Sequence, residues 1–211
     1  MNLYKHIVFD IDGTLIDTEY AILHSLQDTL LSLDKNYSLE KLSFALGITG
    51  KDALKQLKVN DIPNVLKLWD RNMRNYKQKI TFFDGIKEVL QELIKRGYEL
   101  GIVTSKTREE FSSDFDCFGI TNYFHCIICA DDTLEHKPNP EPLLKYIELT
   151  NVKSYEMMYI GDSKYDAMCS KSANVDFGLA VWGHHLKDLS AAYYFDTPKE
   201  ILKELNPIVN L

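Results

Sequence analysis

The chain alternates between short apolar runs and longer segments whose apolar residues recur at helical spacing. A short apolar run between turn residues is typical of a buried strand, and a spacing of three to four is typical of a helix. The runs that predict strands are 7–9, 98–103, 124–130, 156–160, 175–181 and, at a sheet edge, 193–196. The segments that predict helices are 17–32, 39–46, 51–57, 64–79, 86–96, 108–118, 141–150, 165–174 and 198–205.

The order of these elements indicates the fold class. From residue 80 onward, strands alternate with helices, which is typical of βαβ units in a parallel sheet. Between residues 17 and 79 we expect helices and no strand. We therefore predict an α/β fold, with a doubly wound, Rossmann-like parallel-sheet core and a small all-helical cap inserted after the first strand. The expected core comprises residues 1–16 and 80–211, and the expected cap comprises residues 17–79.

Composition narrows the class of protein. With 211 residues, 45% of them hydrophobic and 26% charged, the chain has the make-up of an ordinary soluble protein. Its net charge of -7 argues against a nucleic-acid or membrane partner. No apolar run approaches a membrane span. We expect no signal peptide, because residues 1–6 lead straight into the first predicted strand. We expect a cytoplasmic protein, either a monomer or a weak homodimer.

Cys126 and Cys129 form a single CxxC pair, the remaining cysteines being Cys117 and Cys169. The pair lies inside a predicted strand, and a zinc or redox site would require a second pair or a turn. We therefore expect buried, reduced thiols.

The first predicted strand ends in two carboxylates, Asp10 and Asp12, followed by Gly13. In an open α/β sheet, ligands bind beyond the carboxyl ends of the strands. Two carboxylates this close repel each other, and a bound cation or a proton on one of them relieves the repulsion. The sequence therefore places a candidate site at this strand end.

Four further polar residues follow later strands: Thr104, Lys137, Asp162 and Asp166. The carboxylates offer the oxygen ligands that Mg²⁺ prefers, and a hydroxyl and an ammonium are partners for phosphoryl oxygens. Asp10 can then attack phosphorus as a nucleophile, and Asp12 can exchange a proton with the leaving group and with water. Each residue also has a bland alternative, such as a helix N-cap for Asp162 or a surface position for Asp166 and Lys137.

These residues form four motifs in a familiar order. The motifs are Asp10-Ile11-Asp12-Gly13-Thr14-Leu15, then Thr104, then Lys137 within His136-Lys137-Pro138, and finally Gly161-Asp162-Ser163-Lys164-Tyr165-Asp166. With them, the chain resembles the haloacid dehalogenase (HAD) superfamily of phosphatases over nearly its whole length. The helical insertion resembles that of the subgroup with a small C1-type cap, which includes phosphoglycolate phosphatase and β-phosphoglucomutase relatives.

The resemblance implies a Mg²⁺-dependent phosphatase, with Mn²⁺ as a possible alternative ion. Its substrate would be a small phosphorylated metabolite, with phosphoglycolate as the leading guess, and it would act through an aspartyl-phosphate. Asp10 would be the nucleophile and a metal ligand, and Asp12 the general acid/base with its backbone carbonyl on the metal. Asp162 would bind the metal directly, and Asp166 directly or through water.

The resemblance also implies phosphate-binding residues. Thr104 and Lys137 would hold the phosphate, helped by backbone N–H groups around Ile11, Asp12 and Ser105. Lys106 either touches the phosphate or solvates a loop.

The cap is expected to select the substrate, because closing lids complete such sites. The loop 47–51 is the best candidate to reach the active site, so that Lys51, or Arg71 or Arg74, would meet a carboxylate or second phosphate. A solvated helix face is the alternative for each of the three. His184 and His185 are expected at the rim of the site, Trp182 in packing, and Trp69, Met73 and Tyr76 in the core of the cap.

Several rival functions remain open. A phosphomutase of the β-phosphoglucomutase kind is the nearest, although Thr14 is the residue that phosphatase relatives carry and Gly50 replaces a basic contact expected in a mutase. Pyrophosphatase and nucleotidase activities stay possible. A non-catalytic phosphometabolite-binding regulatory protein is a rival of another class, and the presence of Asp12 argues against it because binding alone needs no acid/base.

Overall fold

The computed structural model describes residues 4–183 and 189–208. Its main feature is a six-stranded sheet in the order β5-β4-β1-β6-β7-β8, in which every pairing is parallel. The strands are β1 (His6–Phe9), β4 (Glu99–Val103), β5 (Cys126–Ile128), β6 (Met157–Gly161), β7 (Asp176–Ala180) and β8 (Tyr193–Phe195). The α/β fold class with a doubly wound, Rossmann-like sheet is confirmed.

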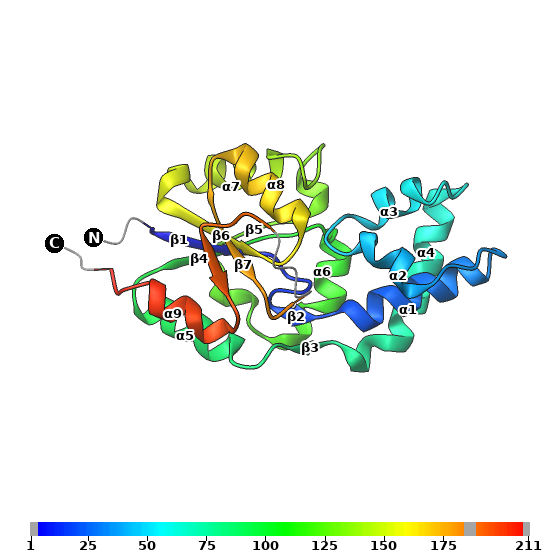
Figure 1. Cartoon of the computed structure of the whole chain (residues 1–211), viewed down its shortest axis with the longest axis horizontal. Coiled ribbons are helices and arrows are strands. Elements are labelled where there is room, and N and C mark those ends of the chain that lie inside the picture. Colours follow the sequence, from blue (N-terminus) through cyan, green and yellow to red (C-terminus); the bar gives the residue numbers. More distant parts are fainter. Residues whose placement is uncertain (1–3, 184–188, 209–211) are drawn as a thin grey trace.

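Helices cover both faces of this sheet (Figure 1). One face packs against α5 (Ile86–Lys95), α6 (Arg108–Asp114) and α9 (Ile201–Glu204), and the other against α7 (Glu141–Thr150) and α8 (Lys164–Ala173). Alternate residues of β1 point to opposite faces, so Ile7 and Phe9 join one hydrophobic cluster and Val8 joins the other. Burial on both faces explains why this strand reads as a continuous apolar run.

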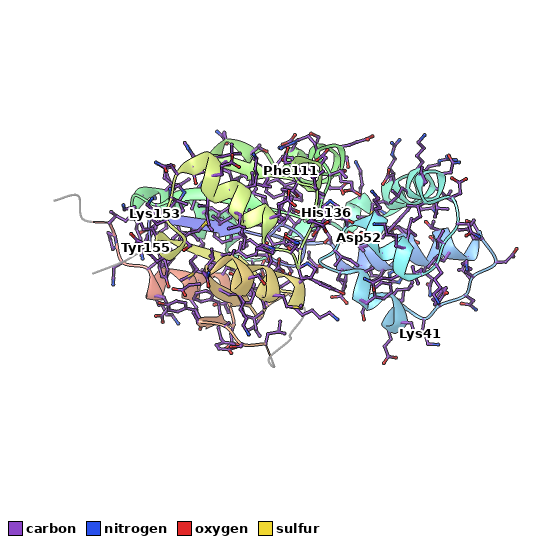
Figure 2. All side chains as sticks on the ribbon, turned by 90° about the horizontal axis from the view of Figure 1, so that it is seen from above. Lys41, Asp52, Phe111, His136, Lys153 and Tyr155 are labelled. Atoms are coloured by element: carbon purple, nitrogen blue, oxygen red, sulfur yellow. The ribbon has the colours of Figure 1, made fainter. Side chains whose placement is uncertain are left out.

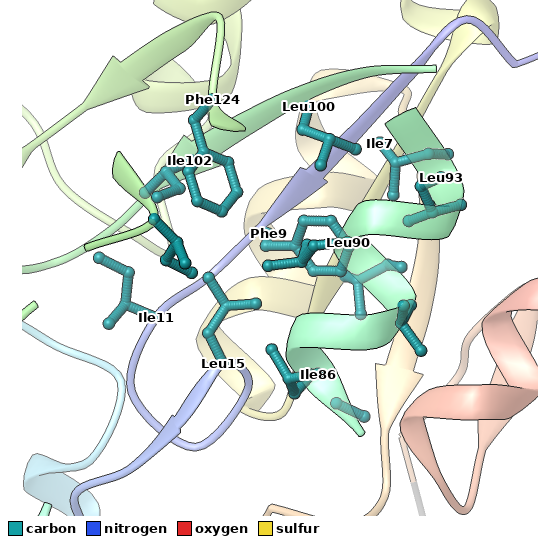
Figure 3. Packing of buried hydrophobic residues seen from close by; sticks show 14 of the residues in the cluster. Ile7, Phe9, Ile11, Leu15, Ile86, Leu90, Leu93, Leu100, Ile102 and Phe124 are labelled. Atoms are coloured by element: carbon teal, nitrogen blue, oxygen red, sulfur yellow. The ribbon is translucent and has the colours of Figure 1, made fainter. Parts of the chain in front are cut away.

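The first cluster is centred on β1 and α5 (Figure 3). Ile86, Leu90 and Leu93 repeat at helical spacing along α5 and are completely buried against Ile7 and Phe9. This packing fixes β1 in the middle of the sheet, and with it the position of the residues that follow the strand.

The insertion between β1 and β4 is mostly helical and forms a separate lobe (Figure 1). Its helices are α1 (Glu19–Leu31), α2 (Leu39–Leu42), α3 (Gly50–Gln56), α4 (Ile62–Met73) and the 3₁₀ helix Arg74–Lys79. Helices α1 to α4 share a third hydrophobic cluster, whose buried members run from Leu23 to Val65. The division into a core and a cap stays a prediction, and we refer to residues 17–79 as the cap.

Some predicted boundaries were wrong. The sequence analysis did not predict a short antiparallel pair, β2 (Ile16–Asp17) with β3 (Thr81–Phe82), where the chain enters and leaves the cap. Of its residues, only Asp17 lies within 17–79, the range where we expected no strand. The predicted helix 108–118 ends at Asp114 and continues as a 3₁₀ turn, and the predicted strand 124–130 shortens to β5. Two-residue strands and 3₁₀ turns carry too little periodicity to be recognised in a sequence.

Among the residues that the structure describes, no helix is both long and apolar enough to cross a membrane.

Candidate functional site

Asp10 follows β1 at the carboxyl edge of the sheet, between the ends of β4 and β6. Its side chain is 2% exposed, and its Oδ1 lies 2.9 Å from Nζ of Lys137. Burial raises the pKa of the Asp10 carboxyl, and the nearby Lys137 ammonium opposes that rise. The site therefore begins with a buried, charge-paired carboxylate.

Lys137 reaches this carboxylate from the loop that precedes α7, and its side chain is 1% exposed. Its Nζ also lies 2.7 Å from Oδ1 of Asp166 and 3.1 Å from the hydroxyl of Tyr159. That hydroxyl lies within hydrogen-bonding distance of Asp166 Oδ1 and of the Val103 carbonyl oxygen. The sequence analysis missed Tyr159, and its only signal there is a phenol inside an otherwise apolar strand.

Asp166 is completely buried in the first turn of α8. Its Oδ2 accepts hydrogen bonds from the backbone N–H and the hydroxyl of Ser163, while its Oδ1 contacts Lys137 and Tyr159. Ser163, not Asp162, is the N-cap of this helix, so the bland alternative for Asp162 does not hold. Its complete burial also rules out a surface position for Asp166, the alternative left open by the sequence.

Asp162 lies just beyond β6 and is 1% exposed. The Thr14 hydroxyl donates to its Oδ1 over 3.4 Å, which links the first and last sequence motifs. Valine at position 14 would remove this donor.

Three buried carboxylates meet here: Asp10, Asp162 and Asp166 have oxygens within 4.8 Å of one another. With the Lys137 ammonium beside them, three negative charges and one positive charge leave two negative charges, which suits a divalent cation. Oδ1 of Asp10 is buried without a well-aligned hydrogen bond, even from Lys137. An all-oxygen, dianionic set fits Mg²⁺ or Mn²⁺.

Asp12 forms a second ionic group with Lys106 and Asp114. Lys106 Nζ lies 3.2 Å from Asp12 Oδ1 and 3.0 Å from Asp114 Oδ2. Lys106 is buried, which contradicts the expectation that it solvates a loop. It also lines the cavity described below, so its contact with a phosphate stays a prediction. Burial lowers the pKa of the Lys106 ammonium, but the surrounding carboxylates, Asp12 first, outweigh this effect, so it stays charged.

Thr104 and Ser105 follow β4, next to β1. Thr104 is buried, and its hydroxyl accepts a hydrogen bond from the backbone N–H of Lys106 at 3.2 Å. The hydroxyl of Ser105 donates to the Gly47 carbonyl at 2.9 Å, so it is engaged with the cap.

Further contacts join the cap to the same edge of the core. The Tyr165 hydroxyl donates to the Phe44 carbonyl at 3.2 Å, and His136 Nδ1 lies 3.1 Å from Asp52 Oδ2. Gly47 packs so closely on Ser163 that an added Cβ would lie 2.7 Å from the serine Cβ and Oγ. The core residues involved are sequence neighbours of the predicted site residues, so the cap rests on the site itself.

A cavity of about 540 Å³ lies between cap and core. Asp10 and Asp12 line its core end together with Ser105 and Lys106. Two of the three predicted cap cations, Lys51 and Arg74, also line it, whereas Arg71 is not among the lining residues. Thr104, Lys137, Asp162 and Asp166 are not in its wall, so the site has a buried floor beneath an open chamber.

The remaining predicted positions have plain structural roles. Trp182 donates from Nε1 to the Thr14 carbonyl at 3.0 Å and packs on the core, as expected. Trp69 packs on the cap cluster as expected, whereas Met73 and Tyr76 pack on the cluster of the core. The four cysteines are free; Cys129 and Cys169 are buried, Cys126 is half-buried and Cys117 is exposed. His184 and His185 lie outside the described residues.

Comparisons with known proteins agree with this fold. The family model described as haloacid dehalogenase-like hydrolase matches residues 7–180. A curated relative named pyrophosphatase PpaX, from Oceanobacillus iheyensis, is 28% identical over 98% of this chain and 96% of its own length. A crystal structure from Lactobacillus plantarum, described as a predicted phosphoglycolate phosphatase, is 30% identical over 96% of this chain and 99% of its own, with a TM-score of 0.88. A second structure so described, from Haemophilus somnus, is 22% identical over 96% and 98%, with a TM-score of 0.79, and shows the fold alone.

The parallel sheet, the helical insertion and the acidic strand ends define an α/β hydrolytic enzyme. The chain belongs to the haloacid dehalogenase-like hydrolase family. The resemblance seen in the sequence and the assignment as a hydrolytic enzyme are confirmed.

Proposed function

We propose that this protein is a Mg²⁺-dependent phosphatase that hydrolyses a small phosphomonoester through an aspartyl-phosphate on Asp10. The observation that carries the proposal is the placement of Asp10, which is buried between Lys137 and two further carboxylates and yet lines the interdomain cavity. An acid in that position is useful to an enzyme and costly to a structural protein, because burying a carboxylate is unfavourable unless a charge or a ligand compensates.

Asp10 and Asp162 are the residues that would hold the metal, with the Asp12 backbone carbonyl. Both oxygens of Asp166 already accept hydrogen bonds, which supports a role through water and as the partner that holds Lys137. A bound Mg²⁺ would reduce the repulsion between the Asp10 carboxylate and the phosphate. The two buried negative charges left by the carboxylates and Lys137 support this assignment.

The reaction follows in two steps. An oxygen of Asp10 attacks phosphorus, the bond from phosphorus to the leaving oxygen breaks, and the carboxyl proton of Asp12 passes to that oxygen. In the second step, Asp12 takes a proton from water as the water oxygen attacks phosphorus. The bond to Asp10 then breaks, which restores its carboxylate and releases inorganic phosphate.

The phosphate oxygens would be held by Lys137, the Thr104 hydroxyl and the backbone N–H groups around Ile11, Asp12 and Ser105. Lys106 pairs with two carboxylates, as Lys137 does, but one of its partners is Asp12, the proposed general acid/base. We assign it to holding the Asp12 carboxyl in place at the edge of the cavity.

The names of the relatives supply two candidate substrates, phosphoglycolate and pyrophosphate. Lys51 and Arg74 line the cavity and could pair with a second negative group on either substrate. Gly50 packs against Leu66 and Trp69, where an added Cβ would lie 3.0 and 3.3 Å from these side chains. A basic side chain at this position would therefore require Leu66 and Trp69 to shift, and its absence favours hydrolysis over the mutase reaction.

The test measures release of inorganic phosphate with and without Mg²⁺, in the wild type and in Asp10→Asn. We expect the variant to lose at least about a thousandfold in turnover, since it removes the nucleophile. The matched control is Asp34→Asn, the same change in an exposed cap turn far from the cavity, which should keep full activity.

Three results would contradict the proposal. Turnover that survives Asp10→Asn would show that the reaction does not pass through an aspartyl-phosphate on Asp10. Return of an isomeric phosphate without net release would indicate a phosphomutase. Binding of phosphorylated metabolites without any turnover would indicate a regulatory binding protein.

A further inference from the structure

The cavity is large for the candidate substrates that the relatives suggest. Its volume of about 540 Å³ falls within the range of about 300–1,000 Å³ that is typical of pockets for drug-sized ligands. Phosphoglycolate and pyrophosphate are far smaller, and their phosphoryl group would already occupy the end beside Asp10 and Asp12. Most of the chamber would then stay empty, so its size indicates a larger leaving group.

The cap side of the chamber is apolar. Ile22, Leu66, Trp69 and Met73 all line it. Trp69 is fixed in place because its Nε1 donates to the Ser25 hydroxyl at 2.9 Å. With that donor engaged, the indole offers the cavity only its carbon surface. A flat apolar face of a ligand can pack on such a surface, whereas a second phosphate or a carboxylate cannot.

The rest of the chamber carries more acids than bases. The lining acids other than Asp10 and Asp12 are Asp70, Glu109, Glu110, Asp114 and Asp131. The lining bases are Lys51, Arg74, Lys77 and Lys106. Lys106 is engaged by Asp12 and Asp114, and Lys77 donates to the Ser113 carbonyl at 3.0 Å. Three of the acids are engaged in the same way: Asp114 by Lys106, Glu110 by the backbone N–H of Thr107, and Asp131 by the backbone N–H of Arg108. The lining charges left for a ligand are therefore Asp70 and Glu109 together with Lys51 and Arg74.

The pKa of Asp70 shows the effect of the acids around it. Burial raises the pKa of its carboxyl to about 6, aided by the nearby carboxylates of Glu110, Glu109 and Asp114 and only partly opposed by Arg74. A second anionic group placed beside Asp70 would meet the same repulsion. Hydroxyl or ammonium groups would instead donate hydrogen bonds to these carboxylates, and bonds of this charged kind are the stronger ones.

We propose that the substrate is the phosphomonoester of a ring compound that lays an apolar face on Trp69 and donates hydroxyl or ammonium hydrogen bonds to Asp70 and Glu109. The proposal rests on the phosphatase function proposed above. Two sources share this chemistry, sugar or amino-sugar phosphates and nucleoside monophosphates. Small substrates with a second anionic group, such as phosphoglycolate and pyrophosphate, do not have it.

The experiment compares kcat/KM for glucose 6-phosphate, glucosamine 6-phosphate, AMP, phosphoglycolate and pyrophosphate in the wild type, Asp70→Asn and Trp69→Leu. We expect at least one ring phosphate to exceed both small anions by more than tenfold. Asp70→Asn should lower kcat/KM for that ring substrate about tenfold, as loss of a charged hydrogen bond does. It should leave the small anions unchanged or improve them, since it removes a repelling charge. The amino-sugar and nucleotide arms separate the two sources.

Asp61→Asn is the matched control, the same change at the start of the same helix but outside the cavity lining. Trp69→Leu keeps an apolar side chain and should reduce ring substrates selectively, with thermal unfolding used to verify that the cap still folds. Faster turnover of either small anion than of every ring phosphate would overturn the inference while leaving the phosphatase function intact. An equal effect of Asp70→Asn on all substrates would also overturn it. Absence of Asp10-dependent phosphate release from every compound would overturn both.

Discussion

Nδ1 of His136 lies 3.1 Å from Oδ2 of Asp52, and this contact joins the core to helix α3 of the cap (Figure 2). His136 immediately precedes Lys137, whose ammonium is paired with Asp10. Burial alone would raise the pKa of the Asp52 carboxyl, but hydrogen bonds from Thr49, His136 and Lys55 lower it overall. The cap therefore contacts the core at the residue next to the proposed phosphate-binding lysine, and closure of the cap would act at that point.

Loss of this contact should weaken closure of the cap. We predict that His136→Ala raises KM about fivefold, which corresponds to about 1 kcal/mol for a half-buried hydrogen bond to a carboxylate, and changes the melting temperature little. Steady-state kinetics with Asp52→Asn alongside would measure the effect. His125→Ala is the control, because His125 is an exposed residue of the core domain that lies near Glu99, which also belongs to the core domain. Equal KM values for the two histidine variants would refute a role of the contact in closure.

Gly47 should be needed for closure on steric grounds. It has φ +86° and lies against Ser163, so Gly47→Ala adds both backbone strain and a clash with the core. Gly119 has φ +69° with nothing within 4 Å of an added Cβ, so Gly119→Ala carries only the backbone cost of about 1–2 kcal/mol. Because the cap can move away from Ser163 and relieve the clash, we predict similar losses of melting temperature in both variants and a loss of kcat/KM above tenfold only in Gly47→Ala. An active Gly47→Ala enzyme would show that the cap need not approach Ser163.

The cluster of Asp10, Asp162 and Asp166 should bind a divalent cation in the folded protein. Mg²⁺ at a hundred times its Kd should stabilise the wild type by about 2.7 kcal/mol, and Asp162→Asn should abolish most of that gain. Thermal unfolding with Mg²⁺ and with EDTA measures this without any substrate.

A second acidic group provides the control for this prediction. Cys129, Asp131 and Asp132 also lie within 4.8 Å of one another. Asp131 accepts from the backbone N–H of Arg108, Asp132 pairs with the Arg108 side chain, and burial raises the pKa of the Cys129 thiol to about 12. The Asp131→Asn variant should therefore still be stabilised by Mg²⁺ as the wild type is. Loss of that stabilisation would show that the metal binds at Asp131 and not at Asp10, Asp162 and Asp166.

Asp70 should destabilise the folded protein at neutral pH. Its pKa rises from 3.8 to about 6 on folding, so the folded state favours the protonated acid. That advantage is present in full below about pH 4 and is lost as the pH rises through 6. We predict that Asp70→Asn is more stable than the wild type by about 1 kcal/mol at pH 8, a reduced figure because Asp70 retains solvent contact, and that the gap closes near pH 4.

Denaturant unfolding of both proteins at the two pH values measures this difference. Asp61→Asn again serves as the control for the amide substitution. A gap that is the same at both pH values would show that the charge of Asp70 is not its cause.

Much of the fold and of the site was accessible to sequence reasoning. Asp10, Thr104 and Asp162 each follow an apolar run, and the parallel sheet places these strand ends side by side. The predicted Lys137 also reaches the site, where it contacts Asp10. Short elements were not accessible: β2 and β3 have two residues each, and their pairing joins positions 16 and 82.

The partners of the site residues were also beyond sequence reasoning. Tyr159 looks like an ordinary strand residue, and Asp114 looks like a surface acid on a helix. Their roles depend on contacts with Lys137 and Lys106 that only packing creates. No sequence pattern pairs Lys106 with Asp114, which explains why the burial of Lys106 was unexpected.

The sequence by itself determined the order of strands and helices, the family and the chemical types at each strand end. It could do so because an apolar run followed by polar turn residues is a local pattern, and local patterns survive without knowledge of neighbours. The tertiary structure decided which charges compensate each other, how the cap rests on the core and what kind of cavity lies between them. His136 and Asp52 are 84 positions apart, and no local pattern reports a contact over that distance.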